Sequence, residues 1–188
     1  MRYLPFLLVV AASAQPYLNL DFETSSRGQP WYWFSNGTGY EFTLDTATFQ
    51  SGSQSLHIRS ASAPATGLGV ASQVFPIEGV RGKHVRVSGW IKTNNVNGYA
   101  AIWWRVDGTS GYISLDNMSQ TGPRGTTDWT PYSFERDVSG DGVDVVFGVF
   151  LAGTGEAWFD NLQVQIDGVP FPQGPPPYIG EPSPARQQ

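Results

Sequence analysis

IWWRVDG, residues 102–108, is the segment from which we predict the fold of this chain. In a β-strand neighbouring side chains point to opposite faces, so residues two apart share a face. One face then carries three apolar side chains, those of Ile102, Trp104 and Val106. The opposite face carries a tryptophan and two charged groups, those of Trp103, Arg105 and Asp107. We predict that the first face packs into a core and that the second faces away from it.

The residues GTSG (108–111) form a predicted turn that joins the strands 99–107 and 111–117 into a hairpin. On the second strand, apolar alternation sends Ile113 and Leu115 to the core face. The remaining side chains join the charged face, and we expect three facing pairs: Asp107 with Tyr112, Arg105 with Ser114, and Trp103 with Asp116.

Composition favours one turn-rich domain, because the 188 residues include 22 Gly and 14 Pro and are 40% hydrophobic but only 14% charged. Short alternating segments recur between clusters of turn-forming residues, and helical periodicity is rare. The predicted strands are residues 17–22, 31–34, 39–44, 54–59, 69–75, 84–92, 99–107, 111–117, 130–137, 143–151 and 157–166. This spacing predicts an all-β fold, a two-sheet antiparallel β-sandwich of the jelly-roll type.

Residues 1–14 (MRYLPFLLVVAASA) have the pattern of a secretory signal peptide, and their apolar run is shorter than the ~20 residues of a membrane span. We expect the folded domain at 15–167, a proline-rich disordered tail at 168–188, and a secreted monomer. Without Arg2 the chain has 10 basic and 16 acidic residues, a formal charge of 10 − 16 = −6, which disfavours nucleic acid as a partner. Because the chain has no cysteine, thiolate catalysis and disulfides are excluded.

The charged face of the hairpin has the residue types of a carbohydrate site. An aromatic ring stacks on the C–H surface of a sugar, while guanidinium, carboxylate and amide groups bind its hydroxyls. The segment 84–92 repeats the pattern, with Trp90 among polar residues. The alternative is structural: Arg105 pairs with Asp107 or Asp116 on a solvated sheet face, which adds at most ~1 kcal/mol.

Several motifs together resemble the galactose-binding-like jelly rolls, including carbohydrate-binding modules of the cellulose- and xylan-binding type and related bacterial accessory domains. They are LNLDFE (18–23), SGSQSLHI (51–58), GKHVRVSGWIKT (82–93), WWRVDG (103–108), LDNM (115–118), GTTDW (125–129) and FGVFLAGTGEAWFDNLQV (147–164). The resemblance implies that Trp103, Arg105, Asp107, Asp116, Asn117 and Asp128 form one polar network. It does not imply whether that network binds a ligand or holds loops, because one fold serves many functions.

In related carbohydrate modules a structural calcium ion lies at one edge of the sandwich, and the resemblance implies ligands here from Glu23, the turn at Ser51 and Asp160. Calcium accepts six to eight oxygen ligands in loose geometry. The alternative is that Asp160 only caps a neighbouring loop.

We therefore predict a secreted, non-catalytic module that binds carbohydrate or a similar polar ligand through Trp103, Arg105, Asp107, Tyr112, Asp116, Asn117, Asp128 and Trp90. A protein-interaction or accessory domain without a small ligand is the alternative. A weak glycan hydrolase using Asp107 and Asp116 is less favoured, because a general acid needs a raised pKa and Arg105 between the two carboxylates would keep both ionised. The histidines His57 and His84 are expected to be structural.

Overall fold

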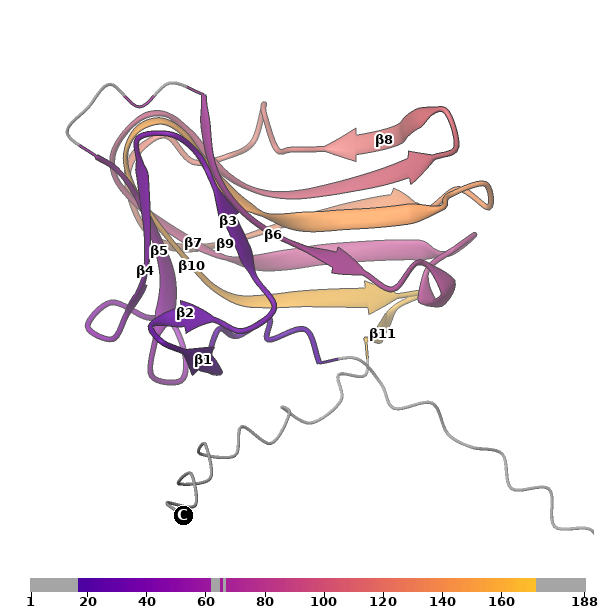
Figure 1. Cartoon of the computed structure of the whole chain (residues 1–188), viewed down its shortest axis with the longest axis horizontal. Coiled ribbons are helices and arrows are strands. Elements are labelled where there is room, and N and C mark those ends of the chain that lie inside the picture. Colours follow the sequence, from indigo (N-terminus) through magenta and orange to yellow (C-terminus); the bar gives the residue numbers. More distant parts are fainter. Residues whose placement is uncertain (1–16, 62–64, 66, 172–188) are drawn as a thin grey trace, which may run out of the picture.

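The computed structural model describes residues 17–61, 65 and 67–171, and these are almost entirely β-structure (Figure 1). The predicted all-β antiparallel sandwich is confirmed. The predicted signal peptide and the tail beyond Phe171 lie outside the described residues. Within the described part, no helix reaches the length and hydropathy that a membrane crossing would need.

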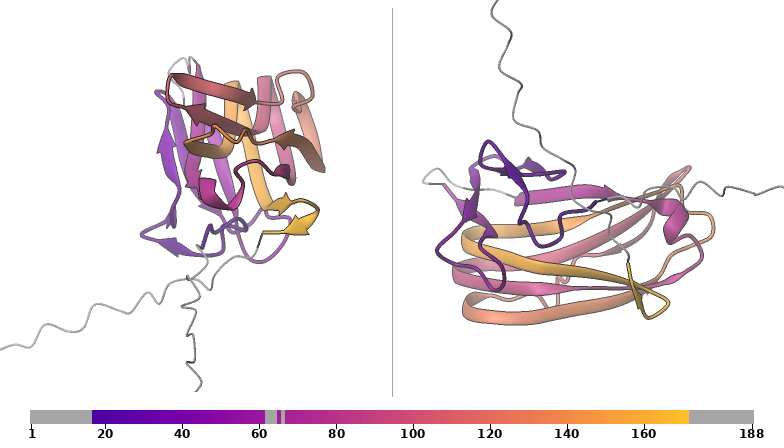
Figure 2. Two further views of the ribbon diagram at one scale, coloured as in Figure 1. Left: turned by 90° about the vertical axis from the view of Figure 1, so that its right-hand side faces the viewer. Right: turned by 90° about the horizontal axis from the view of Figure 1, so that it is seen from below.

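Two long strands, β7 (His84–Gly108) and β10 (Asp144–Ile166), pair antiparallel along nearly their whole length. Each unites two strands that the sequence predicts separately. Both curve round at one end of the molecule, near β4 (Tyr40–Asp45) and β5 (Ser55–Ser60), and then run back (Figures 1 and 2). The ribbon of β7 and β10 therefore contributes one half to each of two sheets.

The bend in this ribbon depends on glycine. Gly153 and Gly155 have φ angles of 75° and 115°, which side-chain-bearing residues rarely adopt. A Cβ on Gly153 would also lie 2.2 Å from the backbone oxygen of Asn97. The pairing shifts register between Thr154 and Glu156 at the same place. The local β-bulge turns the strand from one sheet into the other.

The first sheet contains the second half of β7 and the first half of β10, with three further strands: β3 (Phe34–Asn36), β6 (Leu68–Phe75) and β8 (Gly111–Asp116). The second sheet contains the other halves of β7 and β10, with β4, β5 and β9 (Gly125–Asp137). The smaller elements are β1 (Ser25–Ser26), β2 (Gln29–Pro30), the 3-10 helix η1 (Ile77–Gly79) and β11 (Val169–Pro170).

The core lies between the two sheets and draws large side chains from both. Trp104 is 1% exposed and contacts Phe75 and Phe147 of the first sheet, with ring centroids 5.1 and 5.8 Å away. Phe159 and Leu56 of the second sheet are fully buried in the same cluster. Burial of apolar surface on this scale is the main favourable term in folding a chain without disulfides.

Residues 17–22 do not form the predicted strand. Leu18, Leu20 and Phe22 are buried, but the backbone turns between them, with φ of 49° at Asn19 and 59° at Phe22. The buried Asn19 side chain bonds Thr24 and Trp31, and its backbone oxygen accepts from the Nε1 of Trp33 at 3.1 Å. The alternating hydrophobic pattern therefore comes from three buried side chains on a turning backbone. The turn does not need a neighbouring strand, because the Asn19 side chain supplies the hydrogen bonds that such a strand would provide.

The described chain continues past Asp167, where we expect the domain to end. Residues of β11 pair with the end of β10, and the Phe171 amide donates to the Val164 oxygen at 2.8 Å. The Phe171 ring packs against Phe75 at 4.8 Å. The start of the proline-rich segment thus belongs to the packed structure.

Candidate functional site

The predicted parity of the segment 102–108 is confirmed. Trp104 is buried in the core, whereas Trp103 is half-buried and lies on the outer face of the first sheet. In antiparallel pairing, opposed residues share a face. Phe34, Ser72, Gly148 and Trp103 thus form one row across the outer face, and Val74, Val146, Arg105 and Leu115 form the next.

Beside Trp103 this outer face is hollowed. The cavity has a volume of about 240 Å³ and is lined by Leu68, Val70, Trp103, Arg105, Leu115, Asn117 and Phe150; we call it the Trp103 hollow. Its residues come from β6, β7, β10, β8 and the loop that follows β8. Apolar walls with a few polar groups at the rim are the usual construction of a small-ligand site.

The facing pairs between β7 and β8 agree only in part with prediction. Asp107 lies opposite Tyr112 as predicted, but Arg105 faces Leu115 instead of Ser114. Asp116 faces Trp104 instead of Trp103. The pairing shifts between Val106 and Asp107, and a bulge reverses the parity of the residues beyond it. Leu115 therefore adds an apolar wall to the Trp103 hollow where a serine was expected.

Arg105 is held above the hollow by its neighbour on the same face. Its Nε and Nη2 donate to one oxygen of Asp107 at 3.2 and 2.8 Å. The two side chains are 40% and 24% exposed, so the pair adds little stability. Its effect is to orient the guanidinium, whose remaining N–H groups have no partner among the described residues and can bind hydroxyl or carboxylate oxygens. Tyr112 on the same face is 69% exposed.

The predicted single polar network around Trp103 is wrong. Asp116 pairs with Arg136 of β9 and accepts from the Met118 amide at 3.0 Å, on the opposite side of β8 from Arg105. Asp128 pairs with Lys92 at 2.7 Å on the second sheet. Asn117 does reach the Trp103 hollow. The strand order thus places Asp128 on the second sheet, and the bulge in β8 turns Asp116 away from Trp103.

Trp90 also lies on the second sheet, at an outer-face groove of about 270 Å³ that we call the Trp90 groove. It is paired in register with Asp160 of β10 and Pro131 of β9. Alternation along the strand correctly predicts that Trp90 and Trp103 both point outward. It does not predict that β7 bends between them, so that they lie on two different sheets.

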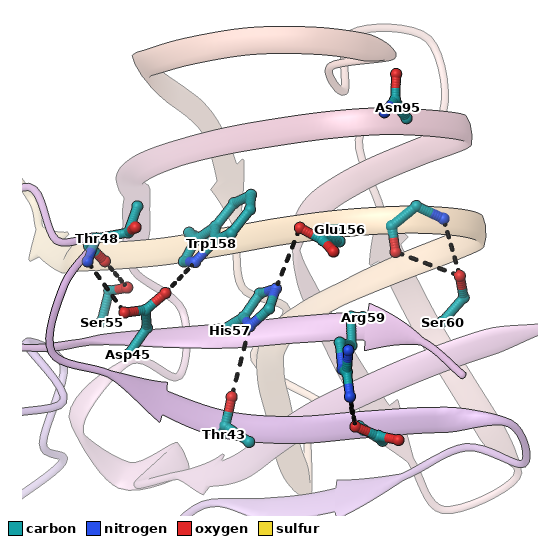
Figure 3. Close-up of polar contacts among 12 residues, drawn as sticks. Thr43, Asp45, Thr48, Ser55, His57, Arg59, Ser60, Asn95, Glu156 and Trp158 are labelled. Carbon is teal, nitrogen blue, oxygen red and sulfur yellow. Dashed lines mark hydrogen bonds and ion pairs between the residues drawn. The ribbon is translucent and has the colours of Figure 1, made fainter. Parts of the chain in front are cut away.

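The strands β4, β5 and β10 of the second sheet carry a polar cluster around His57 (Figure 3). The His57 ring stacks on Trp158 with centroids 4.4 Å apart, and the Nε1 of Trp158 donates to Asp45 at 2.8 Å. Glu156 lies 3.9 Å from His57 Nε2, and Thr43 lies 3.5 Å from Nδ1. Burial lowers the pKa of His57, against the raising effect of the nearby carboxylates. The buried Nε2 of His57 has no hydrogen-bond partner among the described residues, and the structural role of His57 stays a prediction.

Glu23 and Asp160, predicted as calcium ligands, clamp the loop between β4 and β5. Asp160 is fully buried and accepts from the amides of Gln50 and Ser51 at 2.7 and 2.9 Å. Glu23 accepts from the Ser53 amide at 2.9 Å and from its hydroxyl at 2.6 Å. Calcium accepts six to eight oxygen ligands, and here the oxygens of Asp160 and Glu23 accept hydrogen bonds from the loop, as the capping alternative expects. Calcium binding stays a prediction.

No family model matches the chain. A protein of Bacillus subtilis described as an uncharacterized HTH-type transcriptional regulator, YbfP, is 32% identical over 125 residues, and the matched part is 42% of its length. The chain thus spans less than half of that relative.

Solved structures match over most of the described chain. The CBM22-1 xylan-binding domain of Xyn10C from Paenibacillus barcinonensis has a TM-score of 0.60 at 17% identity, and the match covers 83% of this chain and 97% of that one. The C-terminal family 22 module of Clostridium thermocellum Xyn10B has 0.58 at 18%, covering 84% and 98%. This chain has the jelly-roll fold of carbohydrate-binding modules.

The same jelly roll also matches part of an enzymatically active protein. Tailspike protein 4 of bacteriophage CBA120 matches with a TM-score of 0.58 and 14% identity, but the match covers only 21% of that chain. The jelly roll is therefore found both as a separate module and as part of a larger protein. A shared fold does not determine the ligand, which depends on the side chains of the present chain.

Proposed function

We propose that this chain is a secreted, non-catalytic jelly-roll module that binds carbohydrate in the Trp103 hollow. The observation that carries the proposal is the hollow itself, in which the rings of Trp103 and Phe150 meet the polar groups of Arg105 and Asn117. A sugar ring can lay its C–H face on an aromatic ring while its hydroxyls accept from the guanidinium and exchange hydrogen bonds with the amide.

Two further observations support this function. The fold is that of xylan-binding and other carbohydrate-binding modules. The two carboxylates that a hydrolase would need are held apart. Asp107 pairs with Arg105 on the outer face of the hairpin, whereas Asp116 pairs with Arg136 on the opposite face. Two carboxylates acting across one cleft are required for glycoside hydrolysis.

Affinity electrophoresis tests the proposal directly. The purified protein is run in native gels containing xylan, mixed-linkage β-glucan or galactomannan, and retardation by at least one of them is expected. Trp103→Ala weakens binding by about tenfold, equivalent to ~1.4 kcal/mol. Trp129→Ala is the matched control, because Trp129 is a partly exposed tryptophan of β9 on the other sheet. Equal retardation of wild type and Trp103→Ala in every retarding gel contradicts the proposal.

The likeness to a transcriptional regulator favours a second candidate, an accessory domain that contacts protein instead of sugar. Phe34 and Val74, 72% and 57% exposed on the outer face of the first sheet, suit such a contact. In that case no polysaccharide raises the melting temperature. A thermal-shift series with the same three polysaccharides distinguishes the two functions, since a bound ligand stabilises the folded state.

A further inference from the structure

The Trp90 groove is a built site on the sheet that the proposed function does not use. Three neighbouring strands contribute to it: Arg86, Ser88 and Trp90 from β7, Ser133 from β9, and Asn161 and Gln163 from β10. Trp90 is partly exposed, and its row neighbour Pro131 continues an apolar strip beside it. The groove thus combines one aromatic surface with hydroxyl, amide and guanidinium groups.

A β-bulge aims Asn161 at the groove. The pairing of β10 with β7 shifts register between Asp160 and Gln163, and Asn161 has a φ of 47°. Leu162 then points into the core, where it is 3% exposed, while Asn161 and Gln163 both line the groove. Asp160 is paired with Trp90 and so shares its outer face. Regular alternation from Asp160 would turn Asn161 inward and Leu162 outward. The bulge reverses this and places both amides on the outer face. Bulges commonly re-aim a side chain at a binding site, and left-handed backbone outside glycine carries a local cost.

The polar groups of the groove have unused hydrogen-bonding capacity. The Ser88 hydroxyl has no hydrogen bond within the described residues. The amide of Gln163 donates to Asn161 at 3.3 Å and Asn161 donates to Gln50 at 3.4 Å, both near the upper limit of such bonds. Arg86 donates to Ser133 at 3.3 Å. Donors and acceptors therefore surround Trp90 together.

This mixture selects the chemistry of the ligand. A sugar hydroxyl both donates and accepts, so it suits a groove in which hydroxyl and amide groups offer both roles. Glu135 lies 4.0 Å from Arg86 and offsets the single positive charge, which disfavours a phosphate or another anion. A neutral sugar stacked on Trp90 satisfies both conditions.

We propose that the Trp90 groove is a second carbohydrate-binding site, which takes a neutral sugar unit on the outer face of the second sheet. The choice of sugar as ligand rests on the proposed function. The strand β7 bends between the two sheets (Figure 2). Its pairing therefore puts Trp90 and Trp103 on the outer faces of different sheets. One domain can then hold two separate chains, which raises avidity for an insoluble polysaccharide without any new contact.

The test compares Trp90→Ala, Trp103→Ala and the double variant with the wild type in native gels containing xylan, mixed-linkage β-glucan or galactomannan. Each single variant weakens retardation by about tenfold, and the losses multiply in the double variant because the two sites share no partners. Gln163→Ala, which removes an exposed groove side chain, weakens binding in the same gels and guards against a folding defect in Trp90→Ala. Circular dichroism checks the fold of every variant.

The outcomes separate the two sites. Loss of binding in Trp103→Ala, with Trp90→Ala and Gln163→Ala both like wild type, overturns the second site and leaves the proposed function standing. Loss in Trp90→Ala and Gln163→Ala, with Trp103→Ala like wild type, supports the Trp90 groove and overturns the Trp103 hollow. A wild-type protein that none of the three polysaccharides retards overturns both.

Discussion

The side-by-side tryptophans Trp103 and Trp104 should differ sharply in their contribution to stability. Trp104→Ala removes a ring that is 1% exposed and packed against Phe75 and Phe147. Truncating such a residue typically costs about 3–5 kcal/mol. For a domain of this size each kcal/mol lowers the melting temperature by about 2–4 °C, so we expect a decrease of about 6–20 °C. Trp103 is only partly buried and packs against the core from outside, so Trp103→Ala is expected to cost clearly less than Trp104→Ala.

A third variant, Trp104→Phe, separates packing from hydrogen bonding. The Nε1 of Trp104 is buried and has no partner among the described residues. An unsatisfied buried donor costs about 1–3 kcal/mol, and phenylalanine removes it while it keeps most of the ring. We therefore expect Trp104→Phe to lose much less stability than Trp104→Ala. Urea unfolding followed by far-UV circular dichroism measures all three variants. Equal losses in Trp103→Ala and Trp104→Ala would refute the assigned parity.

Three further predictions concern other parts of the molecule. In an NMR titration the pKa of His57 lies below its ordinary value of 6.5 because the ring is buried, and that of His84 lies above it because two carboxylates accept from its ring. The stability that His84 adds is complete below pH 6.5 and disappears as the pH rises through its raised pKa. A difference in unfolding free energy between wild type and His84→Gln that does not change with pH over this range would contradict this. Gly148→Val unfolds the domain or lowers its melting temperature strongly, since even a Cβ would lie 2.1 Å from the Ala71 oxygen; a wild-type melting curve would be inconsistent with that contact. If hydrogen bonds alone close the clamp at Asp160, EDTA leaves the melting temperature unchanged, whereas a rise with the logarithm of calcium concentration would establish the ion.

The candidate site shows how far local patterns extend. The outward direction of Trp103, Arg105 and Trp90 follows from alternation within their own strand and agrees with the structure. The positions of Asp116 and Asp128 depend on how distant strands pair, and they lie away from Trp103. No spacing along the chain could indicate this, because the order of strands in a sheet is set by contacts between segments far apart in sequence.

The apolar walls of the Trp103 hollow show the same limit. Leu68, Val70 and Phe150 come from β6 and β10, which the sequence predicts only as ordinary strands. Leu115 joins them because one bulge in β8 reverses its direction. A bulge depends on the local balance of hydrogen bonds and twist, and no residue pattern in this hairpin predicts it.

By itself, the sequence determined that this protein is built of β-strands and which tryptophan of the central pair is buried, because a strand repeats every two residues and turn-forming residues divide the chain. Only the tertiary structure decided that β7 and β10 pass through both sheets, that β8 is bulged, and that the outward aromatic residues lie on two separate faces. The physical reason is that alternation is a property of one strand, whereas a site is formed by several strands whose pairing is fixed by burial of a common core.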